Sequence, residues 1–280
     1  MKIYWNGQVL PVDEVRLSPM DHGFLVGDGV FETLLARKSQ TYAITRHWQR
    51  LTQSCAAMSL TPPALETLRE VFAQLLAANA LTEARVRLTL TSGAGPAGSE
   101  RGVAPKQTLC ITTTALNVWG ATEQLHLSPW PRLSSGALTG VKSVSYADNV
   151  RALALAKSHG AGECLFANVK GEVCEGTGSN IFIIRGGEIQ TPPLSSGCLA
   201  GVTRALVLEL AQRLDLPVSE QALPMSVLTE GLADEVFLTS TTRDVQPVAR
   251  VGERQFSAPG PITTRLRSAF LEWQAEQPDP

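Results

Sequence analysis

The sequence contains no long apolar run. No stretch approaches the roughly 20 uninterrupted apolar residues that a membrane-spanning helix requires. The opening MKIYWNGQVL carries one lysine and no extended apolar segment, so no secretory signal is expected. The 24 basic residues are scattered and the net charge is only −2. These absences argue against a membrane protein and against a protein that binds nucleic acid or membrane surfaces.

Cysteine and histidine are scarce, and their spacing does not favour a metal site. The five cysteines are an odd number with no pair at CxxC spacing, and the four histidines form neither HxxH nor HExxH. We therefore expect free thiols in a reducing compartment, a cytoplasmic location and no structural metal. The cysteines are Cys55, Cys110, Cys164, Cys174 and Cys198.

The chain has enough apolar residues for a sizeable core. Of its 280 residues, 44% are hydrophobic and 18% are charged, a composition that is ordinary for a globular protein. This length is sufficient for two small domains. Strand and helix patterns are mixed in both halves without regular βαβ repetition. The pattern therefore favours an α+β architecture over a doubly wound sheet.

The first half of the sequence predicts a sheet with two helices. Apolar and polar residues alternate on either side of the turn Asn6-Gly7, which is typical of a hairpin. A strand pair is expected at 30–35 and 41–44, and further strands at 85–91 and 108–113. Apolar spacings of three and four predict helices over 47–58 and 64–80.

The second half predicts helices over 148–158 and 201–214 and strands at 163–168, 180–185 and 235–239. Between the halves, the region near 116–132 lacks clear periodicity and is interpreted as a linker. The expected organisation is a small α+β domain at 1–118, a linker at 119–132 and a larger α+β cofactor-binding domain at 133–280.

Three segments carry features of an anion-binding site. Gly201 precedes a long helix, whose free amides and positive end attract phosphate, and Thr203 adds a hydroxyl donor. The hydroxyl cluster at 239–242 follows an apolar strand, and Arg50 lies on a predicted helix. Each feature is also compatible with an ordinary helix cap, turn or solvated arginine.

Six motifs occur in an order that resembles the class IV aminotransferases, the fold-type IV pyridoxal-phosphate enzymes. The resemblance runs over nearly the whole chain. It implies a two-domain α+β fold of the D-amino acid aminotransferase type. The motifs are GDGVFET at 27–33, HWQRL at 47–51, GVK at 140–142, EGTGSNIF at 175–182, LAGVTR at 199–204 and EVFLTSTT at 235–242.

This resemblance implies roles for individual residues. Lys142 would bind the aldehyde of pyridoxal phosphate through its amine and later move the substrate proton. Glu175 would face the pyridine nitrogen and keep it protonated, and Leu199 would press on one face of the ring. The implied phosphate contacts are Arg50, Val202, Thr203, Ser240 and Thr241, and Gly201 is implied as a further cofactor-binding residue.

Some positions depart from known members of the family. In branched-chain transaminases, a tyrosine five residues after the lysine bonds the cofactor's phenolic oxygen. Tyr146 lies four residues after Lys142 and is the candidate for this cofactor contact. D-amino acid transaminases use an Arg-x-His pair that the segment 89–96 lacks, and Phe31 stands where those enzymes have tyrosine. Phe31, Ser92 and Thr242 are the candidate substrate contacts.

The resemblance is greatest to the aminodeoxychorismate lyases, on the segments 92–102, 142–149 and 191–198. The sequence therefore favours a lyase that converts 4-amino-4-deoxychorismate to 4-aminobenzoate, a folate precursor, and pyruvate. An aminotransferase of branched-chain or D-amino acids with a 2-oxo acid acceptor is the alternative. A cofactor-binding protein without turnover is a third hypothesis, which the intact Lys142 and Glu175 disfavour.

The expected partners are a small-molecule amine substrate and a second copy of the chain. The resemblance implies a homodimer, and it implies a cofactor in the cleft between the two domains, where ligands often bind. Neither nucleic acid nor a membrane is expected as a partner.

Overall fold

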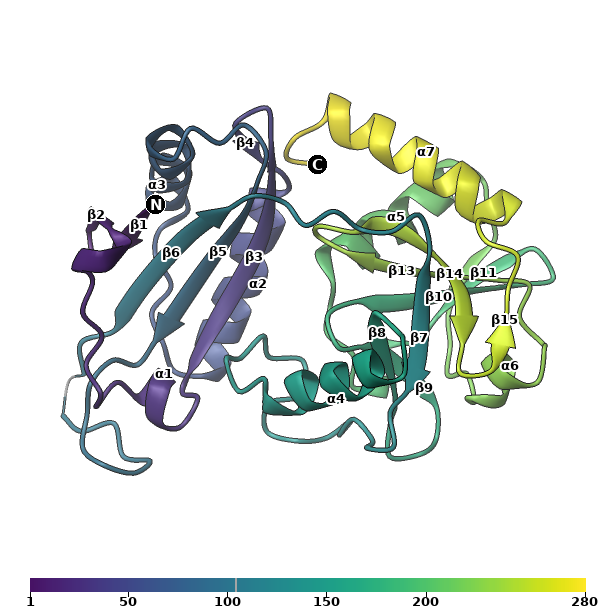
Figure 1. Cartoon of the computed structure of the whole chain (residues 1–280), viewed down its shortest axis with the longest axis horizontal. Helices are drawn as coiled ribbons and strands as arrows, with labels where there is room; N and C mark the ends of the chain where they lie inside the picture. Colours follow the sequence, from purple (N-terminus) through teal and green to yellow (C-terminus); the bar gives the residue numbers. More distant parts are fainter. Residues whose placement is uncertain (104) are drawn as a thin grey trace. The chain divides into compact units, whose positions relative to one another are not determined.

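The computed structural model describes residues 1–103 and 105–280, which form two compact units (Figure 1). The first unit comprises Met1–Asn117, Val141–Tyr146 and Gln277–Pro280. The second comprises Val118–Gly140 and Ala147–Glu276. The α+β class expected from the sequence is confirmed. No helix in the described part of the chain is long and apolar enough to cross a membrane.

The first unit is built on a six-stranded antiparallel sheet in the order β2-β1-β6-β5-β3-β4. Asn6 and Gly7 have φ values of +47° and +100°, as the predicted hairpin turn between β1 and β2 requires. The strands are β1 (Lys2–Trp5), β2 (Gln8–Pro11), β3 (Gly29–Arg37), β4 (Gln40–Thr41), β5 (Ala84–Thr91) and β6 (Thr108–Thr114).

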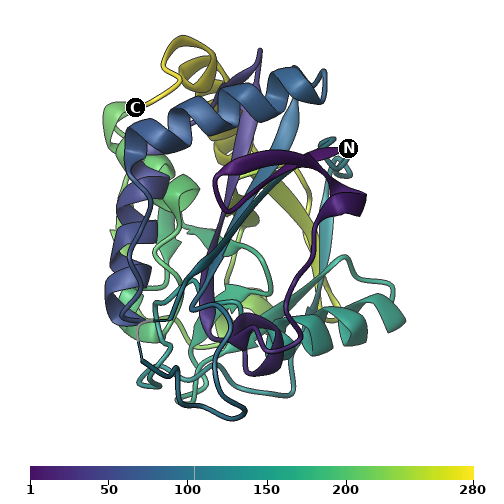
Figure 2. The ribbon, with the colours of Figure 1, turned by 90° about the vertical axis from the view of Figure 1, so that its left-hand side faces the viewer.

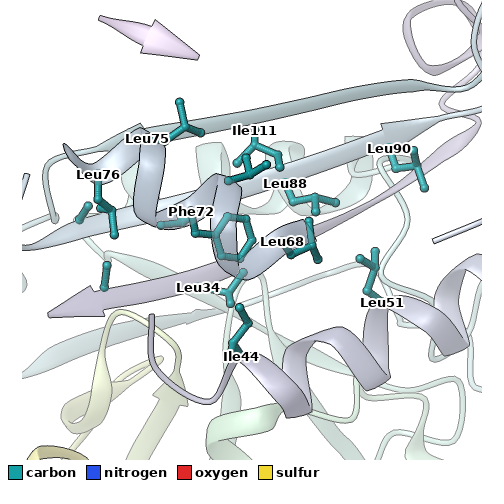
Figure 3. Packing of buried hydrophobic residues seen from close by; sticks show 14 of the residues in the cluster. Leu34, Ile44, Leu51, Leu68, Phe72, Leu75, Leu76, Leu88, Leu90 and Ile111 are labelled. Atoms are coloured by element: carbon teal, nitrogen blue, oxygen red, sulfur yellow. The ribbon is translucent and has the colours of Figure 1, made fainter. Parts of the chain in front are cut away.

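Helices α2 (Ile44–Ala57) and α3 (Leu65–Ala78) pack on this sheet and share one apolar core with it (Figures 2 and 3). Strand alternation directs Val30 and Leu34 of β3 into that core, together with Leu88 of β5. Phe31 therefore points to the opposite face of the sheet. The remaining elements are the short helices η1 (Val12–Glu14) and α1 (His22–Leu25).

The second unit contains a nine-stranded mixed sheet in the order β12-β11-β10-β13-β14-β7-β8-β9, with β15 paired to β14 (Figure 1). Its strands are β7 (Glu123–Leu127), β8 (Glu163–Ala167), β9 (Val173–Gly176), β10 (Asn180–Arg185), β11 (Glu188–Thr191), β12 (Val218–Glu220), β13 (Glu235–Ser240), β14 (Asp244–Val251) and β15 (Arg254–Gln255). Its helices are α4 (Ala147–Ser158), η2 (Leu194–Ser196), α5 (Val202–Arg213), α6 (Ser226–Thr229) and α7 (Pro261–Glu276).

The structure differs from the expected domain boundaries at two places. The segment 119–132 is no simple linker, because β7 lies within it and pairs in parallel with both β14 and β8. β7 is short and buries only Leu125 completely, so its period is too weak to detect in the sequence. Residues Val141–Tyr146, expected in the second domain, belong to the first unit, where they add to the edge of β3.

Candidate functional site

The segment that carries Lys142 pairs with the start of β3. β4 pairs with β3 only at Ala36 and Arg37, so it leaves the backbone groups at the start of β3 available to this segment. The amide of Phe31 donates to the Lys142 carbonyl at 3.0 Å, and the amide of Val144 donates to the Gly29 carbonyl at 2.9 Å. These bonds fix the backbone on both sides of the Lys142 side chain.

The amine of Lys142 lies over an aromatic ring. Its Nζ is 4.2 Å from the centroid of the Phe31 ring, and Tyr146 packs edge-on against the same ring with centroids 5.1 Å apart. The guanidinium carbon of Arg87 lies 4.0 Å from the Phe31 centroid. The sequence-predicted residues Phe31, Lys142 and Tyr146 are therefore brought together. Ser92 is buried just beyond β5, and its amide donates to the carbonyl of Asp28.

On the helix face of β3, Glu32 forms a buried ionic cluster with two residues of α2. Arg50 donates from Nε and Nη2 to the two Glu32 oxygens, each at 2.7 Å, and His47 Nδ1 lies 2.8 Å from Glu32 Oε2. Burial alone would raise the pKa of Glu32, but Arg50 and His47 outweigh it and hold that pKa well below its usual range. Burial lowers the pKa of His47 despite Glu32. The two hydrogen bonds to Glu32 therefore hold the Arg50 guanidinium in one position.

In the second unit, Glu175 lies on β9 and contacts one backbone amide and one arginine. Its Oε2 accepts from the amide of Leu199 at 2.9 Å, and its Oε1 lies 3.4 Å from Arg132 Nε. The Arg132 guanidinium also stacks over Phe166, 4.2 Å from its centroid, and donates to Asn149 Oδ1 at 3.2 Å. Both contacts stabilise an ionised carboxylate at Glu175.

Helix α5 begins beside Asn180, the first residue of strand β10. Gly201 is its N-cap, and no side chain among the described residues caps the amides of Val202 and Thr203. A Cβ on Gly201 would lie 1.9 Å from Asn180 Oδ1, so this position accepts only glycine without rearrangement. Asn180 Nδ2 also donates to the Leu199 carbonyl at 2.9 Å. The arrangement presents uncapped helix amides, which is the geometry of an anion site.

The hydroxyl cluster predicted at 239–242 is adjacent to the first residue of β10. Thr239 of β13 pairs with Asn180 of β10, and α5 packs on β13. Within the described part of the chain, the buried Thr239 Oγ1 has no hydrogen-bond partner. Ser240 ends β13, and Thr241 and Thr242 form the turn into β14. The second unit thus gathers the predicted phosphate-binding residues of two separate motifs.

Three residues that support these arrangements were not assigned roles from the sequence. Glu32 and Asn180 lie inside the recognised motifs, so the motifs could have indicated them. Arg132 carries no signal, because its partner Glu175 is far away in the sequence and only the fold brings the two together. In the described residues, no group of three or more His, Cys, Asp or Glu could hold a metal ion.

The family model that matches this chain is the amino-transferase class IV model, over residues 29–251. A Methanocaldococcus jannaschii protein assigned to the branched-chain-amino-acid aminotransferases is 33% identical over 97% of this chain and 96% of its own. A D-alanine aminotransferase from Staphylococcus haemolyticus is 28% identical, covering 97% of each chain.

Solved structures resemble the fold over the same length. The branched-chain amino acid aminotransferase of Escherichia coli has a TM-score of 0.91 at 27% identity, covering 99% of this chain and 95% of that one. A Legionella pneumophila protein assigned as a 4-amino-4-deoxychorismate lyase has a TM-score of 0.84 at 26% identity, covering 92% and 95%.

Proposed function

Since the chain belongs to the amino-transferase class IV family, we propose that it transfers the amino group of a branched-chain or D-amino acid to a 2-oxo acid. Enzymes of this class use pyridoxal phosphate. The observation that carries the proposal is near full-length similarity to both a branched-chain-amino-acid and a D-alanine aminotransferase. It outweighs the sequence-based preference for the lyase, which rested on short segments.

The residues present fit pyridoxal phosphate. The uncapped amides at the start of α5, where only glycine fits at Gly201, suit a phosphate group, which accepts several hydrogen bonds. Glu175, held by the Leu199 amide and Arg132, suits a protonated ring nitrogen. When bound, the cofactor supplies an electron-accepting ring for the electrons released at the substrate α-carbon.

The proposed roles follow the resemblance to the family. Lys142 would hold the cofactor and carry a proton to and from the substrate, and Tyr146 would orient the cofactor's phenolic oxygen. Glu175 would keep the ring nitrogen protonated, while Leu199 would contact one ring face. The proposed phosphate contacts are Arg50, Val202, Thr203, Ser240 and Thr241, and Gly201 is proposed as a further cofactor-binding residue. Phe31, Ser92 and Thr242 remain candidate substrate contacts.

Branched-chain donors are favoured over D-amino acids. The segment after β5 has no Arg-x-His pair to bind a D-amino acid carboxylate, and Phe31 replaces the expected tyrosine. The similarity to the D-alanine enzyme keeps D-amino acids as donors to be tested. The homodimer implied by the resemblance stays a prediction, which sedimentation of the purified chain would test.

The aminodeoxychorismate lyase is the second candidate function. The Legionella pneumophila structure supports it, together with the lyase-like segments 92–102, 142–149 and 191–198. In both reactions Lys142 would remove a proton from the substrate, so the residues already described would serve either one.

The deciding experiment compares both reactions on the same purified holoenzyme. One sample receives leucine or D-alanine with 2-oxoglutarate, and glutamate is measured; the other receives 4-amino-4-deoxychorismate, and 4-aminobenzoate and pyruvate are measured. We expect rapid glutamate formation from leucine and a rate at least about a thousandfold lower in Lys142→Ala. Rapid stoichiometric release of 4-aminobenzoate and pyruvate without transamination would establish the lyase instead. Turnover of neither substrate set would contradict both assignments.

A further inference from the structure

The turn between β13 and β14 is held in place by a buried arginine. The Arg243 side chain is 5% exposed. Its Nη1 lies 2.6 Å from both Glu123 Oε2 and Gln246 Oε1, and its Nη2 lies 3.0 Å from Glu163 Oε2. One side chain in a three-residue turn thus makes three polar contacts in the interior of the second unit.

These contacts join the turn to two neighbouring strands of the sheet. Glu123 is the first residue of β7 and Glu163 the first residue of β8, and these strands pair in parallel. The ring of Trp119 lies 3.8 Å from the guanidinium carbon of Arg243. Because the guanidinium is both bonded and stacked, the turn has little freedom to shift along the sheet.

Glu163 also holds the loop that follows Glu175. It accepts hydrogen bonds from the amide and the hydroxyl of Thr177, the former at 2.8 Å, and from Ser179 Oγ at 3.3 Å. The ion pair between Glu163 and Arg243 therefore links two segments. One leads from Glu175 to β10, and the other carries the hydroxyls of the turn.

Arg243 offsets one of the two negative charges in this cluster. Two carboxylates, Glu123 and Glu163, face one guanidinium. Removing the arginine would leave two negative groups beneath the turn and would weaken the binding of any anion there. Arg243 therefore fixes the position of the turn and also reduces the negative charge near it.

We propose that Arg243 is a positioning residue that sets the hydroxyls of Ser240 and Thr241 for the cofactor's phosphate group. This inference rests on the proposed function, which places those hydroxyls at the phosphate. Arg243 acts through the turn and through Glu163, without touching the cofactor itself.

The test compares the affinities of the cofactor-free full-length chain for pyridoxal phosphate and for pyridoxal, which lacks the phosphate. The ratio of these affinities isolates the phosphate contacts, whereas a general loss of stability would lower both affinities together. We expect the ratio to fall by about tenfold or more in Arg243→Met. Arg243→Lys, which keeps the charge but reaches fewer acceptors, should give an intermediate ratio.

Arg250→Met is the matched control. Arg250 likewise fastens β14 to β7, through two bonds to Gln124 Oε1 at 3.0 and 2.7 Å, but it lies away from the turn. Its substitution should leave the ratio unchanged. The ³¹P resonance of bound pyridoxal phosphate should move in the Arg243 variants and not in this control.

An unchanged ratio in either Arg243 variant overturns the proposal, and Arg243→Lys decides the matter if Arg243→Met does not fold. An equal fall in the Arg250→Met control would also overturn it, since the effect would then belong to the strand rather than to the turn. If the wild-type chain itself shows no preference for pyridoxal phosphate, the phosphate placement in the proposed function fails. That result differs from loss of preference in the variant alone.

Discussion

The two units hold their candidate functional groups in different ways. In the first unit, an ion pair holds Arg50, because both carboxylate oxygens of the buried Glu32 accept hydrogen bonds from its guanidinium. His47 contacts the same carboxylate. In the second unit, the candidate phosphate donors lie where a helix begins and where a strand ends. They are the first amides of α5, after Gly201, and the hydroxyl turn that follows β13.

This difference determines which kind of substitution each unit tolerates least. A buried charge cluster fails when one partner is removed, because the remaining charge is left without compensation. A site formed by the start of a helix and the end of a strand loses its geometry when a new side chain displaces the backbone, even if no charge changes. The contrast can be tested by substitutions matched to each type of support.

The largest effect is expected from Glu32→Ala in the first unit. This change leaves the buried Arg50 without its carboxylate and should lower the free energy of unfolding by about 3–5 kcal/mol. Urea denaturation measures it. Glu66→Ala is the control, since Glu66 is largely exposed and 3.6 Å from Arg69, and should cost less than about 1 kcal/mol. Equal losses in the two variants would contradict the charge-held description.

A smaller effect is expected from Gly201→Ala in the second unit. The new Cβ would collide with Asn180 Oδ1, so the start of α5 must shift, at a cost of about 1–3 kcal/mol in unfolding free energy. The affinity for pyridoxal phosphate should fall as well. Gly178→Ala is the control, because a Cβ there meets nothing within 4 Å. If both variants retain wild-type affinity, the start of α5 is not the phosphate site.

The ion pair of the first unit should also make the free energy of unfolding depend on pH. The pKa of Glu32 is lowered in the folded chain, so its stabilisation is complete above its unfolded pKa of about 4.3 and is lost as the pH falls towards the folded value. Between pH 5 and pH 3, the unfolding free energy should drop by about 1–2 kcal/mol more in the wild type than in Glu32→Gln. Parallel curves for the two chains, measured by urea denaturation, would be inconsistent with a charged Glu32.

Much of the fold could be predicted from local patterns. Strict alternation predicted β5, the Asn6-Gly7 turn predicted the hairpin, and helical spacing predicted α2, α3, α4 and α5. β7 and β14 could not be recognised in this way. β7 buries too few residues to show a period, and β14 contains Pro247, which ordinarily argues against a strand.

The candidate site was predictable only in part. The motifs identified Lys142, Arg50, Glu175 and the segments near Gly201 and Ser240, because each carries its chemistry within a few adjacent residues. The partners that hold these groups lie elsewhere in the sequence. Glu163 and Arg243 are eighty positions apart, and neither has a local pattern that distinguishes it from a surface charge.

The sequence by itself determined the α+β class, the family and its cofactor, since these depend on periodicity and on short motifs in a given order. Only the tertiary structure decided that Val141–Tyr146 belongs to the first unit. It likewise decided that Glu32 binds Arg50 and that Arg243 binds Glu163 below the turn after β13. Ion pairs and strand-edge pairing depend on groups distant in the chain. Their strength comes from burial, which exists only once the chain has folded.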